Sequence, residues 1–171
     1  MKHGIYEDLK EWLSDAEKVV VAGIGNPIRS DDFLGVKIIQ GLHGKVSENV
    51  LLIECETVPE SFTQQILDFD PTHVLLIDAA ILGLKPGESR LLDSTQLQDS
   101  PAFSTHTLPM RIFCEYIMKM GKAKIGLVLV EPKETDFGEG LSREVDVAVR
   151  KIIHDLLKAL PRRQASLDFE M

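Results

Sequence analysis

Val19–Gly35, VVVAGIGNPIRSDDFLG, carries the strongest structural signal in this sequence. Its first four residues are all apolar, which is typical of a short strand buried on both faces. Gly23 and Gly25 follow, and we expect them to allow a sharp turn because glycine adopts backbone dihedral angles that side chains forbid. Asp31 and Asp32 then precede an apolar spacing typical of a helix, where either carboxylate would serve as a cap. Strand, glycine turn, polar loop and helix together predict a site at the carboxyl end of the first strand of an α/β sheet.

The rest of the chain alternates between predicted strands and predicted helices. The further strands are predicted at Val50–Cys55, His73–Ala80, Glu88–Leu92 and Ile125–Glu131, and the helices at Ile5–Glu17, Glu60–Leu67, Thr107–Met120 and Val145–Leu160. Thr57 and Glu60 have the spacing of a capping box at the start of one of these helices. This alternation predicts an α/β fold, a single three-layer α/β/α domain whose mainly parallel sheet has about five strands, with Glu88–Leu92 as an antiparallel edge.

The 171 residues suit one domain, and no boundary inside the chain suggests a second. We expect residues 1–17 to form an N-terminal helical extension at the edge of that domain. Residues 162–171 are predicted to be a frayed tail, because they have no apolar periodicity.

Composition excludes several classes of protein. The net charge of −8 argues against a nucleic acid partner. No apolar run approaches the roughly 18 residues that span a bilayer, so we expect no membrane insertion. The N-terminus lacks the apolar core of a secretion signal. Cys55 and Cys114 lie far apart without a CxxC motif, and we predict reduced, buried thiols in a cytoplasmic protein.

Three polar residues lie at positions where this architecture gathers functional side chains. Asp32 follows the first predicted strand, Asp78 ends the apolar run of the third, and His106 directly precedes a predicted helix. Each has an ordinary structural alternative, such as a cap or a buried histidine. Strand ends of an open α/β sheet converge on one crevice, however, and two desolvated carboxylates without a cation would repel each other. Two carboxylates and an imidazole are a suitable set for a divalent transition metal.

Four separated motifs resemble those of the nickel–iron hydrogenase maturation endopeptidases. They are GIGNPIRSDDFLG at Gly23–Gly35, IDAA at Ile77–Ala80 with PGE at Pro86–Glu88, STHTLPM at Ser104–Met110, and EPKETDFGEGLS at Glu131–Ser142. They occur in the family's order and spacing, and the resemblance extends from about residue 19 to about residue 160. It implies a metal-dependent endopeptidase that removes the C-terminal extension of a hydrogenase large-subunit precursor after nickel insertion.

The resemblance places the family's three metal ligands, which are also the expected catalytic residues, on Asp32, Asp78 and His106. The expected cofactor is nickel supplied by the substrate, with another divalent metal as the alternative in vitro. An aspartate at position 32 is similar to the branch that acts on hydrogenase 3-type large subunits. Hydrolysis is expected through a metal-polarised carbonyl or a metal-activated water, with Asp32 or Asp78 as the general base. Asp31 is expected to cap a helix or support a ligand, and Arg29 to bind a substrate carboxylate or to have an ordinary surface role.

Three alternatives have weaker support. A dinucleotide-binding protein would share the Gly23-x-Gly25 turn, but Ile28 takes the third glycine position and the two aspartates would repel a pyrophosphate. A peptidyl-tRNA hydrolase begins with a similar strand and turn, but it needs a histidine soon after it. A non-cleaving chaperone for the hydrogenase precursor would bind the same partner without hydrolysis.

Overall fold

One five-stranded sheet organises the protein. The computed structural model describes residues 4–97 and 107–162. The strands are β1 (Val19–Ile24), β2 (Val50–Glu56), β3 (His73–Ala79), β4 (Ser89–Asp93) and β5 (Lys124–Val130), in the order β2-β1-β3-β5-β4. Every neighbouring pair is parallel except β4 and β5, which are antiparallel. The predicted α/β fold, with a mainly parallel sheet and an antiparallel edge strand, is confirmed.

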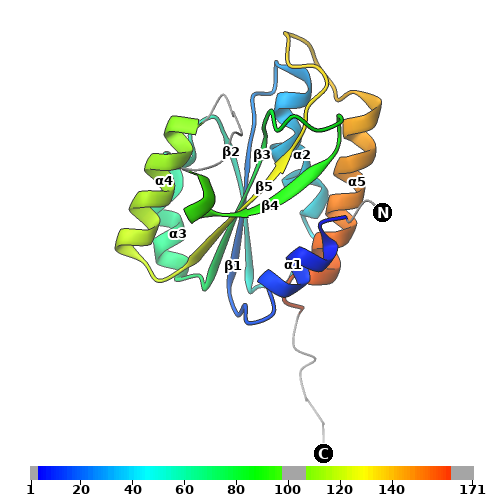
Figure 1. The fold of residues 1–171 in the computed structure, drawn as a ribbon. Helices are drawn as coiled ribbons and strands as arrows, with labels where there is room; N and C mark the ends of the chain where they lie inside the picture. The colour runs from blue at the N-terminus through cyan, green and yellow to red at the C-terminus, as the bar shows by residue number, and fades with distance from the viewer. Residues whose placement is uncertain (1–3, 98–106, 163–171) are drawn as a thin grey trace, which may run out of the picture.

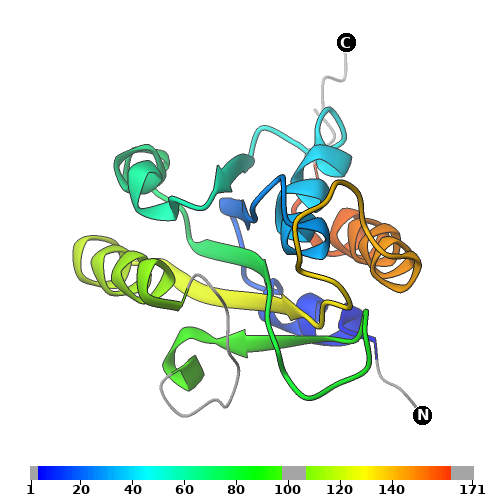
Figure 2. The same cartoon turned by 90° about the horizontal axis from the view of Figure 1, so that it is seen from above.

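Helices cover both faces of this sheet (Figures 1 and 2). One face carries α1 (Tyr6–Trp12), α2 (Leu34–Leu42) and α5 (Arg143–Ala159), and the other carries α3 (Thr63–Phe69) and α4 (Thr107–Met120). Short 3-10 helices at Ser30–Phe33 (η1), Pro59–Phe62 (η2) and Ser94–Leu97 (η3) follow β1, β2 and β4. No helix in the described parts of the chain is both long and apolar enough to cross a membrane.

The central strands β1 and β3 are mostly apolar because both of their faces are covered, and the polar residues of β3 are His73 and Asp78. Every residue of β1 and β3 is buried. Alternate side chains point to opposite faces of the sheet. Val19 and Val21 pack towards α2 and α5, whereas Val20 and Ala22 pack towards α3 and α4. Burying one such valine stabilises the fold by roughly 1.5–3 kcal/mol. The all-apolar runs therefore specify a two-sided core.

Two predicted helices begin or end differently from the prediction. The N-terminal helix was expected over Ile5–Glu17 but ends at Trp12. The predicted helix at Glu60–Leu67 begins as the 3-10 turn η2 and continues as α3, and no side-chain hydrogen bond caps its start. The capping-box prediction for Thr57 and Glu60 is therefore wrong.

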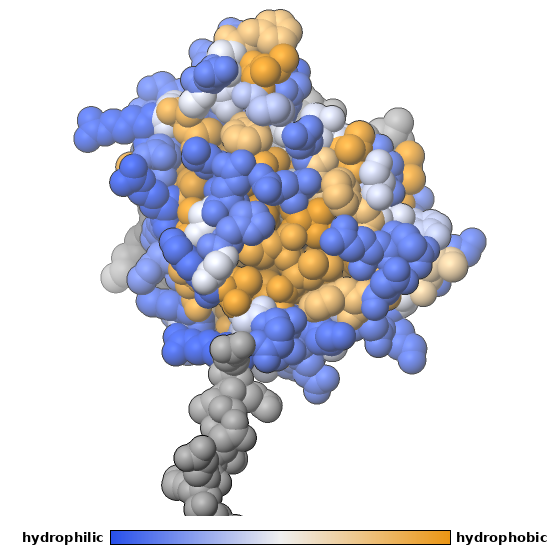
Figure 3. Space-filling model, turned by 180° about the vertical axis from the view of Figure 1, so that it is seen from behind, coloured by the Kyte–Doolittle hydropathy of each residue, from blue (hydrophilic) through white to orange (hydrophobic). Residues whose placement is uncertain are grey.

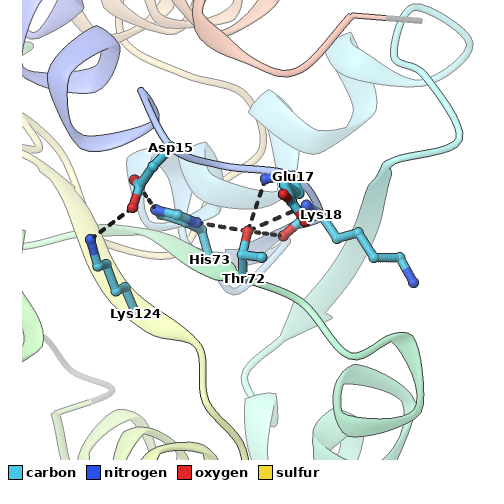
Figure 4. Close-up of polar contacts among 6 residues, drawn as sticks. All are labelled: Asp15, Glu17, Lys18, Thr72, His73 and Lys124. Atoms are coloured by element: carbon cyan, nitrogen blue, oxygen red, sulfur yellow. Dashed lines mark hydrogen bonds and ion pairs between the residues drawn. The ribbon is translucent and has the colours of Figure 1, made fainter. Parts of the chain in front are cut away.

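Helix α1 is part of the main core rather than an appendage. Ile5, Leu9 and Leu13 are buried in the cluster that α2 and α5 form with the sheet. After the helix, the chain is fixed to the strands by polar contacts (Figure 4). Asp15 Oδ1 lies 3.2 Å from His73 Nε2, at ion-pair distance but without hydrogen-bond geometry, and Asp15 Oδ2 lies 3.2 Å from Lys124 Nζ. These contacts lie where β3 and β5 begin.

We expect His73 to make stability sensitive to mildly acidic pH. Burial lowers the pKa of His73 below its ordinary value of 6.5, and the attraction of Asp15 offsets only part of this effect. The unfolded chain therefore takes up a proton more readily than the folded one, so the free energy of unfolding should fall as pH decreases below about 6.5. Urea unfolding at pH 7.5 and pH 5.5 should show a smaller loss for His73→Gln than for the wild type.

His43→Gln is the matched control, because the His43 side chain is 53% exposed. Its loss of stability between the two pH values should equal that of the wild type. Equal losses for the wild type and His73→Gln would contradict the prediction.

Candidate functional site

Asp32 and Asp78 lie at the carboxyl-end edge of two neighbouring strands. Gly23 of β1 pairs with Ile77 of β3, and Asp78 is the next residue. Asp32 is in η1, whose backbone packs against Gly25, the residue after β1, and which also contacts β3. The two aspartates are 3% and 0% exposed, respectively. The structure thus brings two of the three predicted site residues to one edge of the sheet.

Backbone amides hold both carboxylates. Asn26 N donates to Asp32 Oδ2 over 3.2 Å, and Ala79 N donates to Asp78 Oδ1 over 2.8 Å. Because buried polar groups need hydrogen-bond partners, these donors fix the two carboxylates in place at the buried edge. The edge therefore presents two fixed acidic groups, suited to a cation or to proton transfer.

Glycines allow the start of α2 and η1 to pack closely on the end of β1 and the residue after it. A Cβ on Gly23 would lie 2.3 Å from the carbonyl oxygen of Gly35, and one on Gly25 would lie 2.4 Å from that of Asp32. The predicted reason, a dihedral angle forbidden to other residues, is wrong, because neither Gly23 nor Gly25 has a positive φ. Ser30 adopts φ 51° instead, just before the two aspartates. Such strain in a non-glycine residue is typical of functional sites.

Asp31 fixes the loop at residues 132–142 and does not cap a helix. Its carboxylate accepts hydrogen bonds from Lys133 N (2.9 Å), Glu134 N (2.9 Å), Ser142 N (2.7 Å) and the Ser142 hydroxyl (2.8 Å). Asp31 is fully buried. The cap prediction is wrong, whereas the alternative, that Asp31 supports the site, agrees with this geometry. Figures 1 and 2 show this loop beside the segment between β1 and α2.

Removing the Asp31 carboxylate should destabilise the protein. Asp31→Ala leaves three N–H groups and a hydroxyl without their acceptor, and we expect a loss of roughly 3 kcal/mol or more in the free energy of unfolding. Asp31→Asn keeps one acceptor oxygen and should lose less. Urea unfolding measures both, and limited proteolysis should show new cleavage within residues 132–142. The exposed Asp136 provides the control: Asp136→Ala should change neither result, and equal stability of Asp31→Ala and wild type would exclude the role.

Glu131 is a second structural carboxylate at this edge. It directly follows β5 and is 6% exposed. Its carboxylate accepts hydrogen bonds from Leu82 N and Leu84 N, the latter over 2.7 Å, so it fixes the loop after β3. Glu131 was not among the predicted site residues. Its place at a strand end, at the start of EPKETDFGEGLS, was the available signal.

Of the other predicted site residues, the structure describes Arg29 but not His106. His106 lies outside the described residues, and α4 begins at Thr107. Within residues 4–97 and 107–162, no three His, Cys, Asp or Glu side chains are arranged to hold a metal ion. The three-ligand site therefore stays a prediction. Arg29 donates from Nε to the carbonyl of Thr135 over 3.1 Å, which gives it a role in holding the same loop.

Both cysteines are buried, as predicted. Desolvation raises the pKa of Cys55 and of Cys114 to about 12. Because the thiolate is the nucleophile, thiols that stay protonated at neutral pH are unsuited to catalysis. The edge of the sheet that carries Asp32 and Asp78, which we call the acidic edge, is thus the better candidate for a hydrolytic site.

The protein is an open, mainly parallel α/β protein, a class in which ligands bind at the carboxyl ends of the strands, where Asp32 and Asp78 lie. Residues 36–159 match the model of the HycI hydrogenase maturation protease family. The chain belongs to this family. Its members are proteases, and the chain is therefore assigned a role as an endopeptidase in hydrogenase maturation.

Individual relatives agree with this assignment. A Methanocaldococcus jannaschii protein, provisionally named a hydrogenase maturation protease, is 33% identical over 90% of this chain and 95% of its own length. The Escherichia coli hydrogenase 3 maturation protease is 26% identical over 80% of this chain and 87% of its own length. The crystal structure of the [NiFe] hydrogenase maturation protease HycI from Thermococcus kodakarensis has a TM-score of 0.82 and 30% identity, covering 90% of this chain and 98% of that one. These matches favour a maturation protease over the dinucleotide-binding and peptidyl-tRNA hydrolase alternatives.

Proposed function

We propose that this protein removes the C-terminal extension of a nickel–iron hydrogenase large-subunit precursor and recognises the nickel that the precursor carries. The observation that carries the proposal is the pair of buried aspartates, Asp32 and Asp78, at the end of adjacent strands. Carboxylates are ligands for divalent metal ions, and the nickel of the substrate is a cation that arrives with the scissile chain. Family membership supports the same class of reaction.

In the proposed complex, the nickel completes its coordination with Asp32, Asp78 and His106. Carboxylate and imidazole ligands suit nickel, and the shared ion fixes the precursor's chain end against the edge of the sheet. The ligands would therefore recognise a precursor that has received its metal. A precursor without nickel would lack the shared ion and would therefore bind less tightly than the loaded precursor.

Hydrolysis then proceeds by attack of water on the scissile carbonyl. The bond from the carbonyl carbon to the amide nitrogen breaks, and the new carboxylate and amine leave as the two products. One of the two aspartates takes the proton of the attacking water as general base and returns it to the leaving nitrogen. The nickel polarises the carbonyl or the water.

Incubation of purified protein with nickel-loaded precursor tests the function, with mass spectrometry of both fragments. We expect mature large subunit and one released peptide whose masses sum to that of the precursor plus one water. Stable binding with intact precursor would instead support the chaperone alternative. No binding and no cleavage would reject both.

A further inference from the structure

Two large apolar side chains are exposed where the loop at residues 132–142 meets the segment after β1. Phe137 is 84% exposed and Ile28 is 53% exposed. Gly138 N donates to the carbonyl of Ile28 over 2.9 Å, so the segments that carry these two side chains are joined. We call Ile28 and Phe137 the apolar tip. Figure 3 shows apolar surface at the upper end of the molecule, apart from the broad apolar area in the middle of that face.

The apolar tip is held in place by the backbone beneath it. Ser30 N donates to the carbonyl of Gly138 over 2.9 Å, and the Ser30 hydroxyl donates to the carbonyl of Asp136 over 3.0 Å. The Asp31 carboxylate and the Arg29 side chain fix the same loop. Leaving a phenylalanine exposed loses the roughly 1.5–3 kcal/mol of stabilisation that burying its side chain would give. A phenylalanine held outward by this many contacts is suited to burial against a partner.

The surroundings of the apolar tip are mainly acidic, and the neighbouring cation Arg29 is half-buried and bonded to the loop. Glu134, Asp136 and Glu139 are exposed on the same loop. The one lysine of the loop, Lys133, is paired with Glu144, with Nζ and Oε1 2.9 Å apart. A complementary surface therefore has an apolar hollow bordered by lysine or arginine side chains. A second copy of this chain is a poor match, because its tip carries the same negative charge.

We propose that the apolar tip docks into an apolar, basic-rimmed hollow on the hydrogenase large-subunit precursor. This inference rests on the proposed function and names a surface that would bind the precursor. Only three residues separate Ile28 from Asp32, and the bonds from Asp31 tie Phe137's loop to the same turn. A protein whose chain end reaches the edge with Asp32 and Asp78 therefore comes close to the segments that carry the tip. The tip supplies affinity for the body of the precursor, while the edge acts on its chain end.

The test compares Phe137→Ala with Val147→Ala, which truncates another exposed apolar side chain, on α5 and 61% exposed. The dissociation constant for purified nickel-loaded precursor is measured by biolayer interferometry, and kcat and KM are measured by mass spectrometry. Phe137→Ala should weaken binding and raise KM by roughly tenfold, as loss of a central aromatic contact does, with kcat unchanged. Val147→Ala should match the wild type, and both variants should keep the wild-type unfolding midpoint.

A charge reversal tests the rim separately. Glu139→Lys should weaken binding, and the difference from the wild type should shrink as salt is raised. Equal affinity of Phe137→Ala and wild type, equal losses in both alanine variants, or a fall in kcat alone would overturn the proposal. So would a dimer of this chain that dissociates in Phe137→Ala.

The two proposals fail differently in this experiment. If the wild type cleaves the precursor and Phe137→Ala does so with the same KM, the docking surface is wrong and the proposed function stands. If the wild type binds the precursor through Phe137 but does not cleave it, the docking surface stands and the proposed cleavage is wrong. Absence of any binding by the wild type rejects both.

Discussion

Asp78→Asn is expected to lower the rate of precursor cleavage by roughly a hundredfold to a thousandfold. The substitution keeps the size of the side chain and an oxygen that can accept from Ala79 N, but it removes the negative charge. Asp32→Asn should cause a loss of the same order. The fold should survive, because a neutral amide is cheaper to bury than a carboxylate. Cleavage of nickel-loaded precursor, followed by mass spectrometry, gives kcat/KM for each variant.

Asp155→Asn is the matched control for these variants. Asp155 is also buried, at 5% exposure, but it lies in α5 and is paired with Lys151, with Oδ2 and Nζ 3.3 Å apart. The same chemical change there should leave cleavage at the wild-type rate. An active Asp78→Asn, or an equal loss of activity in Asp155→Asn, would show that the acidic edge is not the site of the reaction.

The strands could be predicted from sequence because their apolar character does not depend on particular partners. A strand covered on both faces is apolar along most of its length, as β3 is at residues 74–77, so β3 was predicted to within one residue at its end. Helix α4, with an apolar stripe on one face, was predicted with both ends correct. These signals are local, and the fold follows from their order.

Tertiary contacts decided the features that were predicted wrongly. The apolar spacing after Ile5 continues beyond Trp12, yet the chain leaves the helix there and Asp15 contacts the starts of β3 and β5. His73 lies 58 residues after Asp15 in the sequence. No local pattern around the helix contains this information.

In the candidate site, too, local patterns predicted some features and tertiary contacts decided the others. The positions of Asp32 and Asp78 follow from the rule that strand ends converge on one edge, and the structure places both there. The role of Asp31 did not follow, because its hydrogen-bond donors are 102 to 111 residues away. Gly23 was likewise assigned the wrong reason, since a close approach becomes visible only when the packed segment is known.

Cleavage should require nickel in the precursor and a neutral His106. The nickel-free precursor should be cleaved at least about a hundredfold more slowly, because the ion that fixes its chain end is missing. An imidazole donates its lone pair to a metal only when it is unprotonated, so activity should fall as the pH decreases through about 6.5 and below. His106→Ala should be inactive with loaded precursor at every pH. Parallel reactions with loaded and nickel-free precursor, sampled between pH 5.5 and 8, measure these effects.

His154→Ala is the matched control, because His154 is an exposed histidine on α5. Its pH profile should be that of the wild type, so that any difference in His106→Ala belongs to that position and not to the loss of a histidine. The unfolding midpoints of both variants should be compared at pH 7.5, since the fall in activity must come without loss of the fold. Cleavage of nickel-free precursor at the wild-type rate, or full activity of His106→Ala, would show that the protease does not recognise its substrate through the metal.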